Sequence, residues 1–217
     1  MTHYWPISDG EMLDQIGTSH MKQGDKTSFV TDRFGNPNSA LALNGGWTQV
    51  PEGVYFNMPE FTISVWIKPL RVGQNARILD FGNGSPLDNI VLGLSNGENP
   101  LTPFFAEYEG RDEQFFKSDN KTKLELNKWQ FLAFTFEINQ IRIYLDGKMI
   151  FQSEDEFNYI QPKLKKKCYI GKSNWPKHGF SYSFLDDLRF YNKSLDLNDI
   201  QNLMVLGRFV RKKLFQW

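Results

Sequence analysis

Side chains that could carry out catalysis are few in this sequence and poorly grouped. The densest carboxylates are neighbours along the chain, in Glu154–Glu156 and Asp186–Asp187. Adjacent residues of a strand point to opposite faces, so neighbouring carboxylates in each run splay apart and neither run is a convincing paired site. The histidines, His3, His20 and His178, stand in no nucleophile motif, and signatures for phosphate loops or zinc are missing. These patterns favour binding over catalysis.

Aromatic side chains offer a different chemistry, the stacking of ligand rings. Trp47, Tyr55, Trp175 and Tyr182 lie near or between predicted strands, and His178 shares a loop with Trp175. Sugars stack on aromatic faces, and aromatic clusters also anchor protein partners. We predict these five residues as ligand-binding candidates. Taken singly, Trp47 and Trp175 are more simply explained as packing residues at the rim.

Composition excludes some partners and constrains the fold. Lysine plus arginine and aspartate plus glutamate each total 25, so the formal net charge is zero and no global field attracts nucleic acid. Hydrophobic residues make up 40% of the chain, which is typical of a folded protein. The single cysteine, Cys168, allows no intrachain disulfide and lies in a strand-like run, so we predict a buried, inert thiol.

Period-two alternation is the commonest pattern in the sequence. In Phe61–Pro69, one face carries Phe61, Ile63, Val65 and Ile67, which predicts a half-buried antiparallel strand. Gln140–Phe151 predicts a β-hairpin, because Asp146-Gly147 tolerates the positive φ angles of a primed turn. Trp129–Phe136 is apolar on both faces and predicts a central strand.

Shorter alternating segments and one helix complete the expected elements. The helix is predicted over Leu195–Leu203, with Ser194 as its cap. Many short strands without βαβ spacing indicate an all-β sandwich or barrel. Weaker strands are predicted at Tyr4–Ile7, Ala40–Leu43, Arg77–Phe81, Ile90–Leu94, Phe104–Tyr108, Gln114–Phe116, Cys168–Gly171 and Ser183–Tyr191.

The chain divides into one domain over residues 1–204 and a basic, aromatic tail over residues 205–217. Arg208, Arg211, Lys212 and Lys213 alternate there with apolar residues. The tail is therefore the one segment expected to contact a membrane surface, if any does. The simpler alternative is a final strand or helix that packs on the sandwich.

Several segments, in order, resemble the laminin G-like, pentraxin-like domains of the concanavalin A-like superfamily. They are Ser39–Gly45, Phe61–Pro69, Asn127–Phe136, Ile141–Lys148, Tyr169–Gly171 and Phe184–Asn192. The resemblance implies an antiparallel jelly-roll β-sandwich with one short C-terminal helix. Glucanase members of the superfamily place carboxylates at alternate positions of one strand, and that arrangement is missing here.

The resemblance also implies a structural calcium ion between the N-terminal segment and the last strand. Asp14 and Asp186 would supply carboxylates, and Gly17 and His20 would supply backbone carbonyls. Asn44 is a weaker fifth candidate because Asn-Gly is as readily a turn.

Alternation along the last strand bears on Asp186. It places Asp186 on the inward face with Leu188 and Phe190, where a lone carboxylate is costly unless it is paired or bound to metal. The alternative is that Asp186 pairs with Arg189 or a backbone donor and that no metal is bound.

The expected function is an extracellular or cell-surface recognition module of a larger protein, which binds a glycan or a protein partner. One alternative is a carbohydrate-active enzyme or its accessory domain, which would need Asp80, Glu107 or Asp146 to pair across a concave face. Another is a structural or oligomerising domain of the pentraxin-like kind.

Overall fold

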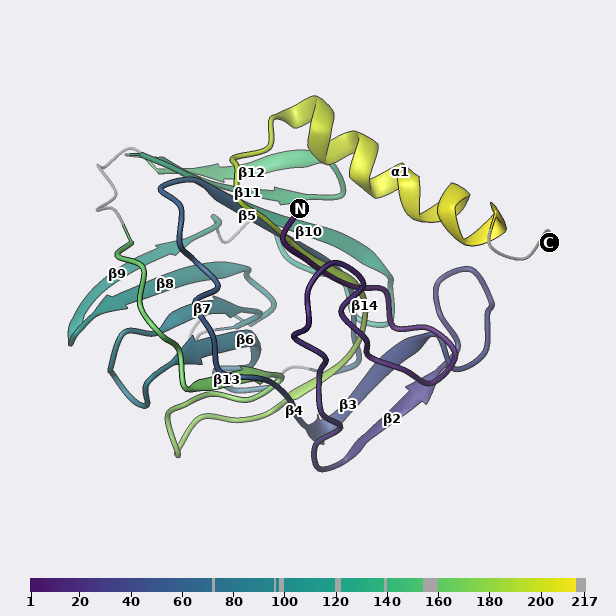
Figure 1. Cartoon of the computed structure of the whole chain (residues 1–217), viewed down its shortest axis with the longest axis horizontal. Helices are drawn as coiled ribbons and strands as arrows, with labels where there is room; N and C mark the ends of the chain where they lie inside the picture. The colour runs from purple at the N-terminus through teal and green to yellow at the C-terminus, as the bar shows by residue number, and fades with distance from the viewer. Residues whose placement is uncertain are drawn as a thin grey trace.

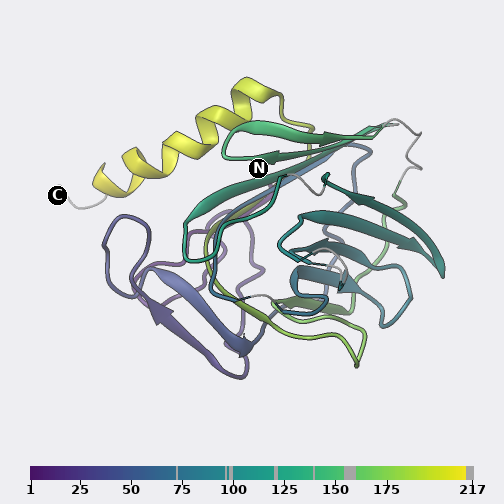
Figure 2. The ribbon, with the colours of Figure 1, turned by 180° about the vertical axis from the view of Figure 1, so that it is seen from behind.

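A computed structural model describes residues 1–71, 73–95, 97, 100–119, 122–138, 140–153 and 160–213 of the chain, with side chains described up to residue 206. In this part of the chain, two antiparallel sheets stack face to face, and one helix lies outside the larger sheet (Figure 1). The same layers are visible from behind (Figure 2). The predicted all-β sandwich is confirmed.

The larger sheet contains eight strands of the described chain. Its order is β12 (Lys148–Gln152), β11 (Gln140–Leu145), β10 (Gln130–Glu137), β5 (Phe61–Pro69), β14 (Ser181–Tyr191), β3 (Ala40–Gly46) and β2 (Thr27–Val30), and β1 (His3–Trp5) pairs with β14. Strand β10 lies between β5 and β11 and is buried on both faces, as its continuous apolar run predicts.

The smaller sheet contains six strands of the described chain. Its order is β4 (Thr48–Val50), β13 (Lys167–Ile170), β6 (Arg77–Gly82), β7 (Ile90–Gly93), β8 (Phe104–Glu109) and β9 (Asp112–Lys117). Each of these strands pairs either with a strand far from it in sequence or with the next strand along the chain, as in a jelly roll.

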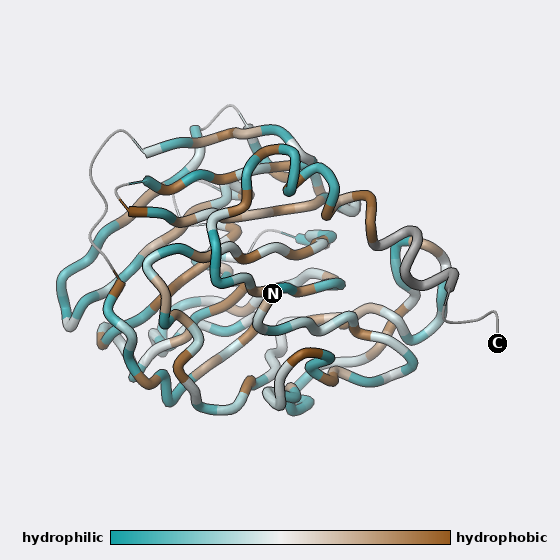
Figure 3. The backbone as a smooth tube through the Cα atoms, turned by 45° about the horizontal axis from the view of Figure 1, so that its top comes forward, coloured by the Kyte–Doolittle hydropathy of each residue, from teal (hydrophilic) through white to brown (hydrophobic). Residues whose placement is uncertain are grey.

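The main hydrophobic core fills the space between the two sheets. Ile63, Val65 and Ile67 of β5 have no exposed surface and pack in one cluster with Phe81 of β6 and Phe105 of β8. On β5, these inward residues alternate with mostly polar ones. Along the chain, apolar stretches recur in the strands, and the connecting loops are mostly hydrophilic (Figure 3).

The hairpin predicted from Asp146-Gly147 is confirmed. Asp146 has φ 49° and Gly147 has φ 73°, and the turn joins β11 directly to β12. Positive φ at both central residues defines the primed turn, whose twist matches that of the strands.

Helix α1 (Leu197–Lys213) covers the outer face of the larger sheet (Figure 1). Ile200 and Leu203 pack with Phe131 and Tyr144 of that sheet. Asp196, rather than the predicted Ser194, caps the helix, since its carboxylate accepts the backbone N–H of Asp199 at 2.8 Å.

The helix is longer than predicted and crosses the expected boundary between residues 204 and 205 without a break. The predicted tail therefore begins inside a helix, and its residues 214–217 lie outside the described part of the chain. Among the described residues, no helix has the length and apolarity needed to cross a bilayer.

Strand β14 carries a bulge that overturns one prediction. Its pairing with β5 shifts between Asp186 and Arg189, and Asp187 has φ 50°. The extra residue reverses the alternation, so Leu188 and Phe190 point into the core while Asp186 lies opposite Trp66 on the outer side. The expectation that Asp186 points inward with Leu188 and Phe190 is wrong.

Candidate functional site

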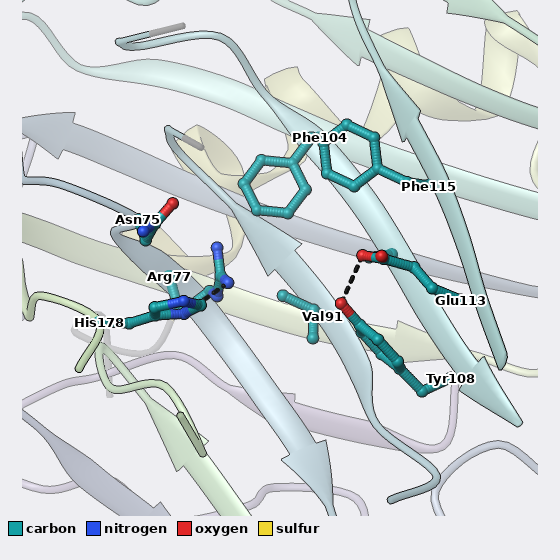
Figure 4. Close-up of a pocket in the computed structure, with 9 residues that line it drawn as sticks. Asn75, Arg77, Val91, Phe104, Tyr108, Glu113, Phe115 and His178 are labelled. Carbon is teal, nitrogen blue, oxygen red and sulfur yellow. Dashed lines mark hydrogen bonds between the residues drawn. The ribbon is translucent and has the colours of Figure 1, made fainter. Parts of the chain in front are cut away.

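A pocket opens on the outer face of the smaller sheet, away from the main core (Figure 4). It has a volume of about 180 Å³. Strands β6 to β9 and two loops supply its lining, which combines aromatic rings with a few charged and polar groups. The lining residues are Asn75, Arg77, Val91, Phe104, Ala106, Tyr108, Glu113, Phe115 and His178.

Alternation along the strands produces the aromatic part of this lining. Phe105 of β8 points into the core, so Phe104 and Tyr108 point outward. Phe115 of β9 packs beside Phe104 with ring centroids 5.0 Å apart, and it remains 39% exposed. Rings held on neighbouring strands form a rigid apolar wall, in which Phe104 is buried and Phe115 faces solvent.

Arg77 occupies one end of the pocket and is only 6% exposed. Its guanidinium carbon lies 5.0 Å from the centre of the Phe104 ring. Its Nη2 donates to Nδ1 of His178 at 3.0 Å, whereas Nε and Nη1 are buried without a hydrogen-bond partner. Burial lowers the pKa of Arg77, because the charged form loses hydration.

The loop that carries His178 is fixed to the sheet by a buried carboxylate. Asp80 of β6 accepts the backbone N–H and the side-chain amide of Asn174, each at 2.8 Å. Burial raises the pKa of Asp80, and these bonds oppose the rise. The loop thereby places Trp175 over Tyr108, with ring centroids 4.9 Å apart.

His178 is neutral in this setting. Burial and then the charge of Arg77 lower the pKa of His178 to about 4. The ring stacks on Trp175, with centroids 5.7 Å apart and planes at 11°. His178 therefore presents an uncharged polar edge beside an aromatic surface.

The structure brings together two of the five residues predicted to bind a ligand, namely Trp175 and His178. Trp47 lies elsewhere, edge-on to Tyr169 at 5.2 Å, and Arg71 covers the Tyr182 ring at 3.3 Å. Neither Trp47 nor Tyr182 lines the pocket.

Tyr55 is a core residue, which corrects its prediction as a surface aromatic. It is 6% exposed, packs against Phe81 at 5.0 Å, and donates its hydroxyl to the carbonyl of Pro51 at 2.6 Å. An apolar body with one satisfied hydroxyl is typical of a buried tyrosine.

Sequence reasoning missed most of the lining, above all Arg77, Phe104 and Phe115. The pair Phe104-Phe105 carried a usable signal, because two adjacent apolar residues in a strand must face opposite sides. One of the two therefore had to lie on the outer face. Arg77 carried no such signal, since a single arginine at a strand start is ordinarily solvated.

The residues predicted to hold calcium do not form an oxygen cage around Asp14. The Asp14 carboxylate accepts backbone N–H groups of Tyr4 at 3.0 Å, Gly17 at 3.1 Å and Ile16 at 3.2 Å, and lies 2.7 Å from Nδ1 of His3. Burial opposes ionisation, but the bonds from His3 and these amides outweigh it and lower the pKa of Asp14 to about 2.

Two further calcium candidates, Gly17 and His20, were predicted to supply backbone carbonyls, and both make hydrogen bonds with Asp14 through nitrogen atoms. Gly17 donates its backbone N–H to the Asp14 carboxylate. Nδ1 of His20 accepts the backbone N–H of Asp14 at 3.0 Å. Calcium requires several oxygen ligands, whereas the groups that face Asp14 are nitrogen donors.

Asp186 forms an ion pair with the buried Arg33, which also binds Asp187. This ion pair with Arg33 accounts for the burial of the Asp186 carboxylate without Arg189 or a metal ion. Asn44 is exposed on β3. The described residues contain no group of three or more side chains arranged to hold a metal. This arrangement does not fit a calcium ion, and the ion stays a prediction.

The carboxylates named for an enzymatic reading do not converge in the described chain. Asp80 lies on the outer side of β6, whereas alternation with Ala106 turns Glu107 to the inner side of β8. Asp146 lies in a turn of the other sheet and accepts the backbone N–H of Phe131 at 2.8 Å. The run Glu154–Glu156 lies outside the described residues.

Comparisons with solved structures support the fold. Domain 4 of AbnA, a GH43 extracellular arabinanase from Geobacillus stearothermophilus solved with arabinotriose, superposes with a TM-score of 0.74 at 18% identity, covering 94% of this chain and 97% of that one. The binding domain of botulinum neurotoxin DC in complex with rat synaptotagmin II gives 0.72 at 16% identity, covering 96% of this chain.

A third structure, described by the dependence of botulinum neurotoxin type C cell entry on two ganglioside molecules, has a TM-score of 0.72 at 16% identity and covers 95% of this chain. This chain spans only about half of the toxin chains, 52% and 51% respectively. At such identities the likeness establishes the fold alone. No curated protein matches the sequence.

The family of this chain follows from a family model, because the solved structures establish only the fold. The model described as concanavalin A-like lectin/glucanases superfamily, of the laminin G type, matches residues 43–201, which is more than half of the chain. The matched range contains the strands from which the pocket is built. The chain belongs to the concanavalin A-like lectin/glucanases superfamily.

Proposed function

We propose that this protein is a non-catalytic recognition module that binds a saccharide on the outer face of the smaller sheet. The observation that carries the proposal is the pocket itself. Tyr108 and Phe115 form the exposed part of an aromatic wall, with the buried Phe104 packed against Phe115, and Arg77 and Glu113 offer hydrogen-bonding groups at the two ends of the pocket. A few polar groups around an apolar surface are typical of small-ligand sites.

Rigid positioning supports the same proposal. The wall stands on hydrogen-bonded strands, and Asp80 ties the Trp175 loop to β6. A site that is already in place loses little conformational freedom when it binds, which favours weak, polar ligands such as saccharides. The solved relative with arabinotriose and the ganglioside-dependent toxin are consistent with such a role.

We also propose that this protein acts outside the cell, because the similar arabinanase domain belongs to an extracellular enzyme. A protein partner on the same face is the alternative outcome of the test below. The oligomerising role stays a prediction, which sedimentation would test.

The test is a glycan array followed by calorimetry with the best saccharide. Phe115→Ala should weaken binding by about 5- to 150-fold, since stacking on one aromatic ring is worth about 1–3 kcal/mol by analogy with nucleic-acid bases. Phe34→Ala is the matched control: Phe34 is 38% exposed, against 39% for Phe115, and lies in the loop over the larger sheet. It should bind normally.

An array with no bound saccharide contradicts the proposal. Equal loss of binding in the Phe115 and Phe34 variants would also contradict it, because the site would then not be the pocket.

A further inference from the structure

The Arg77 end of the pocket has unfilled hydrogen-bonding capacity. A guanidinium carries five N–H donors. In the described chain it finds one acceptor, Nδ1 of His178, and Nε and Nη1 remain buried without a partner. Buried polar groups are nearly always hydrogen-bonded, and an exception at the end of a pocket points to a ligand that supplies the acceptor.

The charge of Arg77 is likewise unpaired within the described residues. No carboxylate lies within ion-pair distance of it in that part of the chain. The nearby Asp80 is engaged by Asn174 and by Asn89, whose amide donates to it at 2.7 Å. A buried cation without an anion is costly, so an anionic ligand group would be strongly favoured there.

His178 adds a second donor at the same end. Its Nδ1 accepts the N–H of Arg77, so the proton of the neutral ring resides on Nε2. Arg77 and His178 together therefore offer N–H groups to the pocket and no free acceptor. A hydroxyl could use part of this surface, but an acceptor-only group uses all of it.

The opposite end of the pocket has the reverse character. Glu113 accepts the hydroxyl of Tyr108, and both lie across the cavity from Arg77 and His178 (Figure 4). A carboxylate accepts hydrogen bonds from sugar hydroxyls and repels a second negative charge. The pocket is thus polarised, with its anion-accepting end at Arg77.

From this polarity we propose that the site takes an acidic saccharide, whose carboxylate binds Arg77 while its ring stacks on Phe115. This inference rests on the saccharide binding proposed above and goes further by naming the charge of the ligand. The forked guanidinium donates charge-assisted hydrogen bonds to a carboxylate, which has acceptors only.

The experiment compares matched saccharides on one array. It carries neutral oligosaccharides, the same backbones with uronic acids, the methyl esters of those acids, sialylated glycans and sulfated glycans. The full chain should prefer carboxylated saccharides over their methyl esters by at least about tenfold, the size expected for one charge-assisted hydrogen-bond pair.

Arg77→Met should abolish that preference, so that acids and their esters bind alike. Arg71→Met is the matched control, because Arg71 stacks on Tyr182 and does not line the pocket. It should keep the preference. Melting curves verify that each variant is folded, and if Arg77→Met does not fold, the preference of the unaltered chain for acid over ester decides alone.

The outcomes separate the two proposals. Equal binding of acids and esters, or a preference for neutral or sulfated saccharides, overturns the carboxylate inference and leaves saccharide binding in place. Binding of no saccharide at all overturns both. A preference for acids that survives in Arg77→Met places the carboxylate elsewhere and also overturns the inference.

Discussion

The two sheets treat buried charge in opposite ways. On the larger sheet, Arg33 is matched by Asp186 and Asp187, and hydrogen bonds overcome burial to keep the pKa of Asp14 at about 2. On the smaller sheet, burial lowers the pKa of Arg77 and raises that of Asp80; the mutual attraction of the two charges opposes both shifts, but neither group forms an ion pair among the described residues. Matched charges hold a fold together, whereas unmatched ones mark where an outside partner completes the structure.

The two sheets also differ in how their outer faces are covered. Helix α1 and the Arg33 loop lie over the outer face of the larger sheet, and Arg33 stacks on Trp66 at 4.7 Å. The outer face of the smaller sheet keeps its pocket open (Figure 4). One broad face is therefore covered by other parts of the fold, and the other is the face on which we propose that the ligand binds.

The largest effect should come from removing the matched arginine. Arg33→Met removes this cation from the buried Asp186, leaves Asp187 with Arg189 at 3.5 Å, and should lower the free energy of unfolding by about 3–5 kcal/mol. Arg77→Met strands no ion-paired partner and should change it by less than about 1 kcal/mol. Urea unfolding measures both, and equal losses would break the comparison.

Apolar packing should show the same contrast. Ile200→Ala, at a residue of α1 with no exposed surface, should cost about 2–4 kcal/mol because it leaves a cavity against the sheet. Phe115→Ala, on the open face, should cost no more than about half of that, since Phe115 is 39% exposed. A larger loss for Phe115 would mean that the pocket wall supports the fold.

A pH series tests the unmatched charges of the smaller sheet. Burial, and then the charge of Glu109, raise the pKa of Glu107 from 4.5 to about 7. The folded state therefore holds a proton that the unfolded state releases, and this stabilisation is complete below about pH 4.5 and is lost as pH rises through 7.

Glu107→Gln should remove this loss, so the variant gains on the order of 1–3 kcal/mol relative to the unaltered chain between pH 5 and pH 8. Glu125→Gln, at an exposed residue, is the control. Parallel stability curves for the Glu107 variant and the unaltered chain would show that Glu107 ionises freely in the fold.

The smallest effect is expected from calcium. Because Arg33 supplies the positive charge beside Asp186, and nitrogen donors surround Asp14, melts with calcium and with a chelator should coincide within about 1 °C. A rise with calcium that Asp186→Ala abolishes would restore the metal site and weaken the contrast between the two sheets.

Local patterns in the sequence were sufficient for much of the fold. The alternation of Phe61–Pro69 predicted β5 with its bounds, and Asp146-Gly147 predicted its turn, because strands and turns depend on neighbouring residues. Strands β2 and β4, with four and three residues, were too short to show a period.

The site was less predictable, since it depends on distant residues. Arg33 and Asp186 are separated by 153 positions, and no spacing rule joins them. The bulge at Asp187 reversed the faces of β14, and nothing in the alternation announced it. Trp175 and His178 were identified as candidates because they share one loop, whereas the strands that oppose them required the three-dimensional pairing.

The Asp80 carboxylate has a consequence for how quickly a ligand is captured. It fixes Asn174 through two bonds before any ligand arrives, so the neighbouring Trp175 and His178 stand ready without a closing motion. Encounter would then be limited by diffusion and orientation, and the lifetime of the complex alone would distinguish a good ligand from a poor one.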